Sequence, residues 1–197
     1  LYLTGDANDY VGKGMAGGQI VIRPHNGTAF KAEEATIAGN TCLYGATGGA
    51  LYASGCVGER FGVRNSGATA VVEGIGDNGC EYMTGGVVTV LGKTGINFGA
   101  GMTGGFAYIW DVDGCFTGRI NGEMVEGLSI RDLPMHQEHL RGLISRHVEL
   151  TQSNVVERIL ANWESHLDQF VLVKPKSNDL HPFLVHNRRT FPQLLAV

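Results

Sequence analysis

Proline, cysteine and long apolar runs are scarce in this sequence. Of 197 residues 5 are proline and 30 are glycine, so the chain is not the proline–glycine mixture that is typical of a disordered linker. It contains no run of about 18 apolar residues, which a membrane-spanning helix would need. The opening residues lack the charged, apolar and small-residue regions of a secretory signal. Because the first residue is Leu1, we expect the chain to be part of a longer polypeptide.

The sequence also has only a small excess of charge of one sign. The formal net charge is −4, the pI is near 6.0, and 17% of the residues are charged. A protein that binds nucleic acid or an anionic membrane would instead carry a basic surface, so we expect neither partner. The hydrophobic share of 43% is sufficient for a core in one or two domains of ordinary size.

The four cysteines stand far apart, at Cys42, Cys56, Cys80 and Cys115. None has the close spacing of a zinc site or an iron–sulfur cluster, so we expect no metal site built from this chain alone. Disulfide frameworks usually belong to shorter secreted chains that are richer in cysteine. The pattern therefore predicts reduced, mostly buried cysteines in a cytoplasmic protein.

Glycine is concentrated in the first part of the chain. Of the 30 glycines, 29 lie in residues 1–127 and only Gly142 follows, whereas four of the five prolines and six of the seven histidines come later. A composition break of this kind predicts a change of architecture. We place the boundary after residue 128.

The first part repeats itself. Four segments join a small-residue turn to four or five β-prone residues, and a fifth segment is a degenerate copy. In chain order they are Met15–Ile22, Ala46–Ala53, Arg64–Val71 (the degenerate copy), Met83–Val90 and Met102–Ile109. Their starts are 31, 18, 19 and 19 residues apart, so the first interval fits one coil with an insertion of about a dozen residues.

A period of 18–19 residues is too short for a propeller blade or a helical repeat and fits one coil of a β-solenoid. Each coil would stack on the next at the ~4.8 Å spacing of neighbouring strands. One coil alone cannot bury its apolar face, so the array is the folding unit. The sequence predicts an all-β-dominated fold over residues 1–128, with about six or seven coils.

The repeat also explains the glycines. A corner between strands needs a positive φ or leaves no room for a Cβ atom against the neighbouring coil. The predicted corner residues are Gly12, Gly14, Gly17, Gly18, Gly48, Gly49, Gly67, Gly85, Gly86, Gly99, Gly101, Gly104 and Gly105.

Two literal G-x-G-x-x-G matches, at residues 12–17 and 99–104, fall among these glycines. The dinucleotide-binding fingerprint requires a strand before the motif and a helix after it. Both matches run instead into strand-like sequence. We therefore interpret them as corners and not as a nucleotide site.

The second part reads as two helices and a short strand over residues 129–175. Asp132 is a plausible N-cap with Pro134 in the first turn, and Asn154 with Glu157 resembles a capping box. Phe170–Val173 reads as a strand. The apolar stripes of the two helices are Leu140, Leu143, Ile144 and Val148, and then Val156, Ile159, Leu160, Trp163 and Leu167. We expect this part to cap the open end of the solenoid, and residues 176–197 to be a loose tail.

Histidines are the remaining candidates for chemistry. His136 and His139 are three residues apart, but the H-E-x-x-H pattern is absent, so we interpret them as solvated surface residues. His25 is the one histidine in the repeat region. It keeps open a second possibility, a hexapeptide-repeat acyltransferase that uses a histidine base. Coils of that class need an aliphatic residue at every sixth position. Asp77 interrupts this pattern, and the 19-residue period differs from the 18 residues of three hexapeptides.

The stretch at residues 12–23, and residues 65–76 together with 95–110, closely resemble the C-terminal domain of the glutamate synthase large subunit. Residues 138–175 resemble the helices and closing strand of the same domain. The resemblance covers roughly residues 1–175. It implies a glycine-rich right-handed parallel β-helix. A more distant resemblance, to the C subunit of formylmethanofuran dehydrogenase, keeps open a stand-alone β-helix that binds a partner.

The first resemblance also implies a function. Glutamate synthase makes two L-glutamate from L-glutamine, 2-oxoglutarate and reductant, using FMN and an iron–sulfur cluster in the large subunit and, in the bacterial form, FAD and NADPH on a small subunit. None of the family's catalytic elements matches a position in this sequence. We therefore expect no catalytic, cofactor-binding or metal-binding residue here. The expected role is a structural domain that packs against the amidotransferase and FMN domains of the same subunit.

Overall fold

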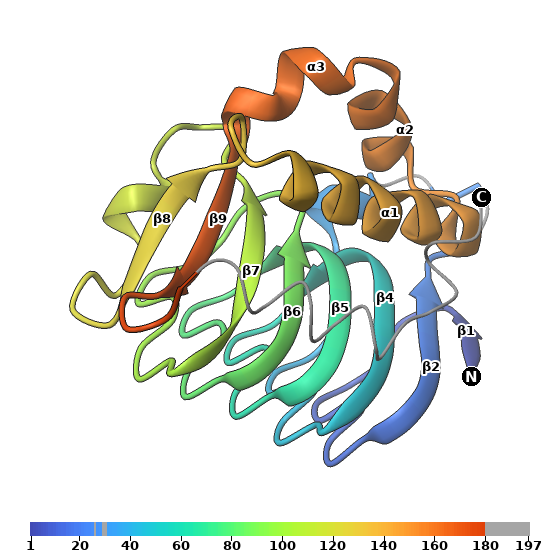
Figure 1. The fold of residues 1–197 in the computed structure, drawn as a ribbon. Coiled ribbons are helices and arrows are strands. Elements are labelled where there is room, and N and C mark those ends of the chain that lie inside the picture. Colours follow the sequence, from blue (N-terminus) through green and yellow to red (C-terminus); the bar gives the residue numbers. More distant parts are fainter. Residues whose placement is uncertain (26, 29–30, 180–197) are drawn as a thin grey trace.

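The computed structural model describes residues 1–25, 27–28 and 31–179. Within these residues the chain forms nine strands, three α-helices and three short 3-10 turns (Figure 1). The order is β1 (Tyr2–Thr4), β2 (Ala16–Arg23), the turn Ala32–Glu34, β3 (Thr36–Ala38), β4 (Gly48–Val57), β5 (Ser66–Ile75), β6 (Thr84–Val90), β7 (Gly104–Trp110), the turn Phe116–Gly118, β8 (Val125–Ser129), α1 (Pro134–Thr151), α2 (Asn154–Ala161), α3 (Trp163–His166), the turn Leu167–Gln169 and β9 (Phe170–Pro175).

Six strands stack in parallel to form a β-solenoid. Their order is β1, β2, β4, β5, β6 and β7, and the five pairings between them define five turns in the described part of the chain. The solenoid predicted from the repeats is confirmed, but the number of coils is about five and not six or seven. After β7 the chain begins one more coil, in which Ile120 forms an isolated parallel bridge with Phe98 of the preceding coil. No further parallel strand of the solenoid follows in the described residues. The next place in the sheet is then taken by β9, which pairs antiparallel with β7.

The strand register confirms the period. One position of the coil is occupied in turn by Tyr2, Val21, Tyr52, Val71, Thr89 and Tyr108. These numbers differ by 19, 31, 19, 18 and 19. The long interval holds the predicted insertion, which carries β3, and β3 pairs with the end of β4.

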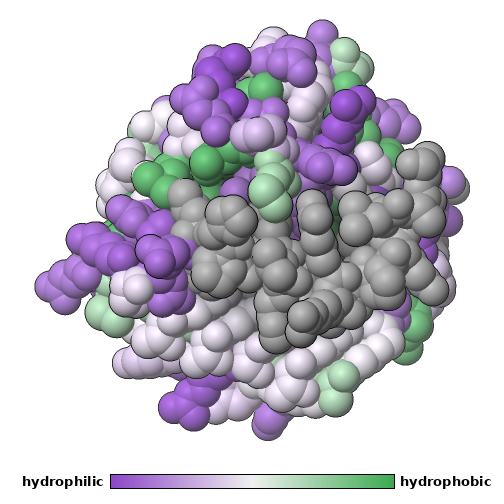
Figure 2. Space-filling view, in the orientation of Figure 1, coloured by the Kyte–Doolittle hydropathy of each residue, from purple (hydrophilic) through white to green (hydrophobic). Residues whose placement is uncertain are grey.

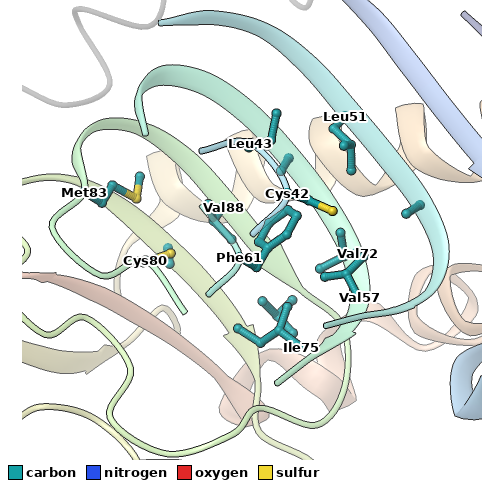
Figure 3. Packing of buried hydrophobic residues seen from close by; sticks show 14 of the residues in the cluster. Cys42, Leu43, Leu51, Val57, Phe61, Val72, Ile75, Cys80, Met83 and Val88 are labelled. Atoms are coloured by element: carbon teal, nitrogen blue, oxygen red, sulfur yellow. The ribbon is translucent and has the colours of Figure 1, made fainter. Parts of the chain in front are cut away.

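Two hydrophobic cores share the sheet. The inner core fills the space that the coils enclose, where Phe61, Val72 and Val88 from successive coils point toward one another (Figure 3). The outer core lies between the opposite face of the sheet and the helices, and it contains Tyr52, Phe106, Leu140, Ile144, Val156 and Ile159. Alternate strand residues face each core, so the strands are buried on both sides, as is typical of parallel sheets.

The helices lie along the outer face of the sheet, whereas we expected them to cover the end of the solenoid. Helix α1 packs across β2, β4 and β5, and α2 and α3 follow it on the same side (Figure 1). The end next to β7 is covered by the antiparallel pair β9 and β8. None of the helices in the described residues is both long and apolar enough to cross a membrane.

The helix ends differ from the prediction. The N-cap of α1 is Leu133 and not Asp132, and it makes no side-chain cap bond. The N-cap of α2 is Ser153, whose hydroxyl accepts a hydrogen bond from the amide of Val156 at 3.2 Å, so Asn154 is the first helical residue. The second predicted stripe is divided at Asn162, where α2 ends and α3 begins.

The predicted boundary after residue 128 falls inside β8, which pairs with β9 and so joins the sheet to the C-terminal part. Of the predicted loose tail, residues 180–197 lie outside the described residues.

Candidate functional site

The predicted corner glycines fall into three groups. Eight have a positive φ, between 65° and 90°: Gly12, Gly14, Gly18, Gly49, Gly86, Gly99, Gly101 and Gly105. Four others have no room for a Cβ atom, because it would meet a carbonyl oxygen of the preceding coil: Gly48, Gly67, Gly85 and Gly104. Gly17 has neither feature, since nothing lies within 4 Å of the place where its Cβ atom would be.

Residues other than glycine also adopt the left-handed conformation, which the sequence analysis missed. On the wall opposite the strands, Leu43 and Cys80 have φ near 60°, and they stack in line with Gly62 and Gly99. Each of these four residues donates its backbone amide to a carbonyl of the preceding coil, over 2.8–2.9 Å. This ladder holds non-glycine residues in a conformation that is uncommon for them. The left-handed conformation in this wall is therefore stabilised by the hydrogen bonds between successive coils, and it does not require glycine at every position.

Both G-x-G-x-x-G matches lead into strands, β2 after residue 17 and β7 after residue 104, so the context of a dinucleotide fingerprint is absent from them. The four cysteines are free thiols. Burial raises the pKa of Cys42, Cys56 and Cys80, which makes them poor nucleophiles, while Cys115 is exposed. Among the described residues, no group of three or more His, Cys, Asp or Glu side chains is placed to hold a metal ion.

A buried polar cluster lies where α1 meets α2. Glu73 on β5 is 2% exposed, and its Oε1 accepts hydrogen bonds from the hydroxyls of Ser54 at 3.1 Å and Ser153 at 2.5 Å. Nε2 of His147, which is fully buried on α1, lies 3.4 Å from the same oxygen. A buried carboxylate requires such partners. The cluster fixes both helices to the sheet.

A second buried contact joins β7 to the start of α1. The hydroxyl of Tyr108 lies 2.9 Å from Nδ1 of His136 and 3.0 Å from Nδ1 of His139. The hydroxyl has one hydrogen, so it donates to one ring and accepts from the other, and the two rings are opposite tautomers. Burial lowers the pKa of each histidine to about 4 and raises that of Tyr108. The prediction of solvated surface histidines is wrong: His136 is 4% exposed and packs edge-on against Phe106.

His25 lies at a pocket of about 300 Å³ beside the insertion. Asp6, Thr36 and Ser54 also line this pocket. In the described part of the chain, the imidazole of His25 makes no hydrogen bond to a carboxylate, which a general base would use for its orientation. The pocket wall touches the buried cluster through Ser54, whose hydroxyl is already bonded to Glu73.

Comparisons with known proteins agree with the resemblance. Residues 1–176 match the family model described as "GXGXG motif". The chain is 55% identical to "Glutamate synthase [NADH]" of Schizosaccharomyces pombe over 89% of its own length and 8% of that protein. It is 53% identical to "Ferredoxin-dependent glutamate synthase 2, chloroplastic" of Arabidopsis thaliana, over 92% of the chain and 11% of the relative.

A cyanobacterial relative, "Ferredoxin-dependent glutamate synthase 2" of Synechocystis sp., is 54% identical over 92% of the chain and 12% of its own length. The chain therefore spans about a tenth of the length of these relatives. The matched segment occurs in relatives that are named for different electron donors, NADH in one and ferredoxin in the other two.

Proposed function

The chain belongs to the GXGXG motif family, and we propose that it is the structural β-helix domain of a glutamate synthase large subunit. In this proposal the whole polypeptide makes two L-glutamate from L-glutamine, 2-oxoglutarate and reductant. This chain contributes no catalytic residue and binds no cofactor. It supports the amidotransferase and FMN-binding domains.

One observation carries the structural role: two clusters of buried polar side chains attach the helices of the domain to its own sheet. Glu73 is bonded to Ser153, and Tyr108 is bonded to His136 and His139. Groups held in this way are withdrawn from solvent and substrate, and they give the domain a fixed outer shape. A domain of fixed shape is suited to holding other domains in place.

In this proposal the cofactors and the partner subunit belong to the rest of the enzyme. FMN and the iron–sulfur cluster belong to other parts of the large subunit, and a small subunit with FAD and NADPH is a partner in the forms that have one. The relatives are named for NADH or ferredoxin, so the donor is not specified by this chain. We keep the cytoplasmic location expected from the sequence, although some relatives are named chloroplastic.

Removal of the domain tests this proposal. We expect a large subunit truncated to exclude residues 1–197 to lose glutamine hydrolysis and 2-oxoglutarate amination together, with a lower melting temperature, because the remaining domains lose a shared support. A truncated subunit that keeps its melting temperature and both activities would contradict a structural role. Selective loss of one activity at an unchanged melting temperature would indicate a direct part in that reaction.

A further inference from the structure

A pocket of about 300 Å³ lies where the insertion after β2 meets the solenoid. Its walls come from four parts of the chain: the residues that follow β1, the residues that follow β2, the strand β3 with the residue before it, and the strand β4. A Cβ atom on Gly5 would lie 3.9 Å from Nε2 of His25, so the first two of these walls lie side by side. Small-molecule pockets begin at roughly 300 Å³, so this one suits a small ligand.

The lining combines apolar walls with one carboxylate. Pro24, Ala35 and Ile37 supply hydrocarbon surface, and Ile37 is buried. Asp6 also lines the pocket, and in the described part of the chain it forms no ion pair. None of the lining residues that the structure describes is a lysine or an arginine. The pocket therefore offers a negative charge without a cation of its own.

Ser54 adds a buried acceptor to the wall. It is 4% exposed, and its hydroxyl donates to Oε1 of Glu73 at 3.1 Å. Because the hydroxyl hydrogen is used in this bond, the oxygen lone pairs remain to accept a hydrogen bond from a ligand. Oε2 of Glu73 has no hydrogen-bond partner among the described residues. The carboxylate behind Ser54 polarises its hydroxyl and so makes the oxygen a stronger acceptor.

The unpaired state of Asp6 contrasts with acidic side chains elsewhere. Figure 2 shows hydrophilic residues gathered over the helices α2 and α3 and at the β8 end of the molecule. Acidic side chains of these regions form ion pairs, as Asp168 does with Arg131 and Glu126 does with Lys174. A carboxylate that is already paired with a cation has less attraction left for a second one. Asp6 keeps its attraction for a cation in the pocket.

We propose that this pocket binds a small alkylammonium ion, which is a protonated primary amine on a short hydrocarbon chain. The ammonium group pairs with Asp6 and donates a hydrogen bond to Ser54, and the hydrocarbon chain lies against the apolar wall. An ammonium group has three donors and no acceptor, which matches a wall that offers acceptors. A carboxylate ligand would face Asp6 with no lysine or arginine to receive it. This inference goes beyond the proposed function and does not depend on it.

Three probes of similar length test the recognition of charge: n-butylammonium, n-butanol and butyrate. Saturation-transfer difference NMR on the full-length large subunit measures the binding of each probe. We expect n-butylammonium to bind about tenfold more tightly than n-butanol, because only the ammonium forms a charge-assisted bond, and we expect butyrate not to displace it. Equal affinity for n-butylammonium and n-butanol, or no binding of n-butylammonium, would overturn the proposal.

Two matched substitutions in the full-length subunit test the location. Asp6→Asn keeps the size of the side chain and removes its charge, and we expect it to weaken n-butylammonium binding by about tenfold. Asp132→Asn removes an exposed carboxylate that does not line the pocket, and we expect an affinity within about twofold of the parent. An unchanged affinity in Asp6→Asn would overturn the proposal.

Glutamate synthase activity of the same preparation separates this inference from the proposed function. A subunit without activity contradicts the proposed function whatever it binds. An active subunit that does not bind n-butylammonium contradicts only the assignment of the pocket.

Discussion

The hydroxyl of Ser153 donates a 2.5 Å hydrogen bond to Oε1 of Glu73, although 80 residues separate the two in the chain. Ser153 is the N-cap of α2 and Glu73 lies on β5, so this bond ties the start of a helix to the middle of the solenoid. Both residues are buried. The same hydroxyl accepts from the amide of Val156, so one side chain serves both the helix and the sheet.

We expect Ser153→Ala to lower the free energy of unfolding by about 1–3 kcal/mol, because it removes a helix cap and a donor to a buried carboxylate. Urea denaturation measures this change. Ser165→Ala is the matched control: its hydroxyl donates to the backbone carbonyl of Asn162 near a helix start, at 2.7 Å, but it is exposed, and we expect less than about 0.5 kcal/mol. Equal effects of the two substitutions would contradict the structural importance of the Glu73 cluster.

Corner substitutions test the stacking of the coils. Gly86 has φ +84° and Gly105 has φ +71°, and a Cβ atom on either would overlap backbone of the preceding coil. We expect Gly86→Val and Gly105→Val each to cost more than about 1 kcal/mol in stability, measured by thermal melting.

Gly17→Ala is the control for the corner substitutions, because Gly17 has open space where a Cβ atom would lie and no positive φ. We expect it to leave the melting temperature nearly unchanged or to raise it slightly. A loss as large as that of Gly86→Val would show that the register of the coils is misassigned.

Stability should depend on pH through His136 and His139. Burial lowers the pKa of each to about 4 in the folded chain, from 6.5. Below pH 6.5 the unfolded chain therefore binds protons that the folded chain does not. The contribution of these residues to stability is fully present above about pH 7 and falls progressively as the pH drops toward 4, by an amount on the order of 1–3 kcal/mol.

Chemical denaturation at several pH values measures this dependence. We expect a variant with His136→Gln and His139→Gln to be less stable than the parent at pH 7.5, but to lose less stability than the parent between pH 7 and pH 5. A parallel pH dependence in the variant and the parent would show that other groups cause the acid sensitivity.

The solenoid could be predicted from the sequence because its repeat is local. A small-residue turn followed directly by a strand recurs about once in each coil. The left-handed Leu43 and Cys80 could not be predicted in this way. Their conformation depends on amides bonded to the preceding coil, and no propensity of leucine or cysteine indicates it.

The burial of His136 and the partial burial of His139 were missed for a similar reason. Helical spacing places His136 and His139 on one face of α1, but which face is buried depends on Tyr108, whose hydroxyl needs partners in an apolar core. Glu73 did carry a signal: a carboxylate inside the apolar strand β5 requires a buried donor. The residue that supplies it, Ser153, is separated from it by three strands and a helix and is identified only by the fold.

The central claim is that this domain supports the enzyme without taking part in its chemistry. The most direct test is kcat of the full-length enzyme with both His25→Ala and Cys115→Ala, which remove the pocket histidine and the exposed thiol. The account predicts a kcat within about twofold of the parent at an unchanged melting temperature, whereas loss of a catalytic acid or base costs roughly 100-fold or more. A fall in kcat of that size with the domain still folded would contradict it.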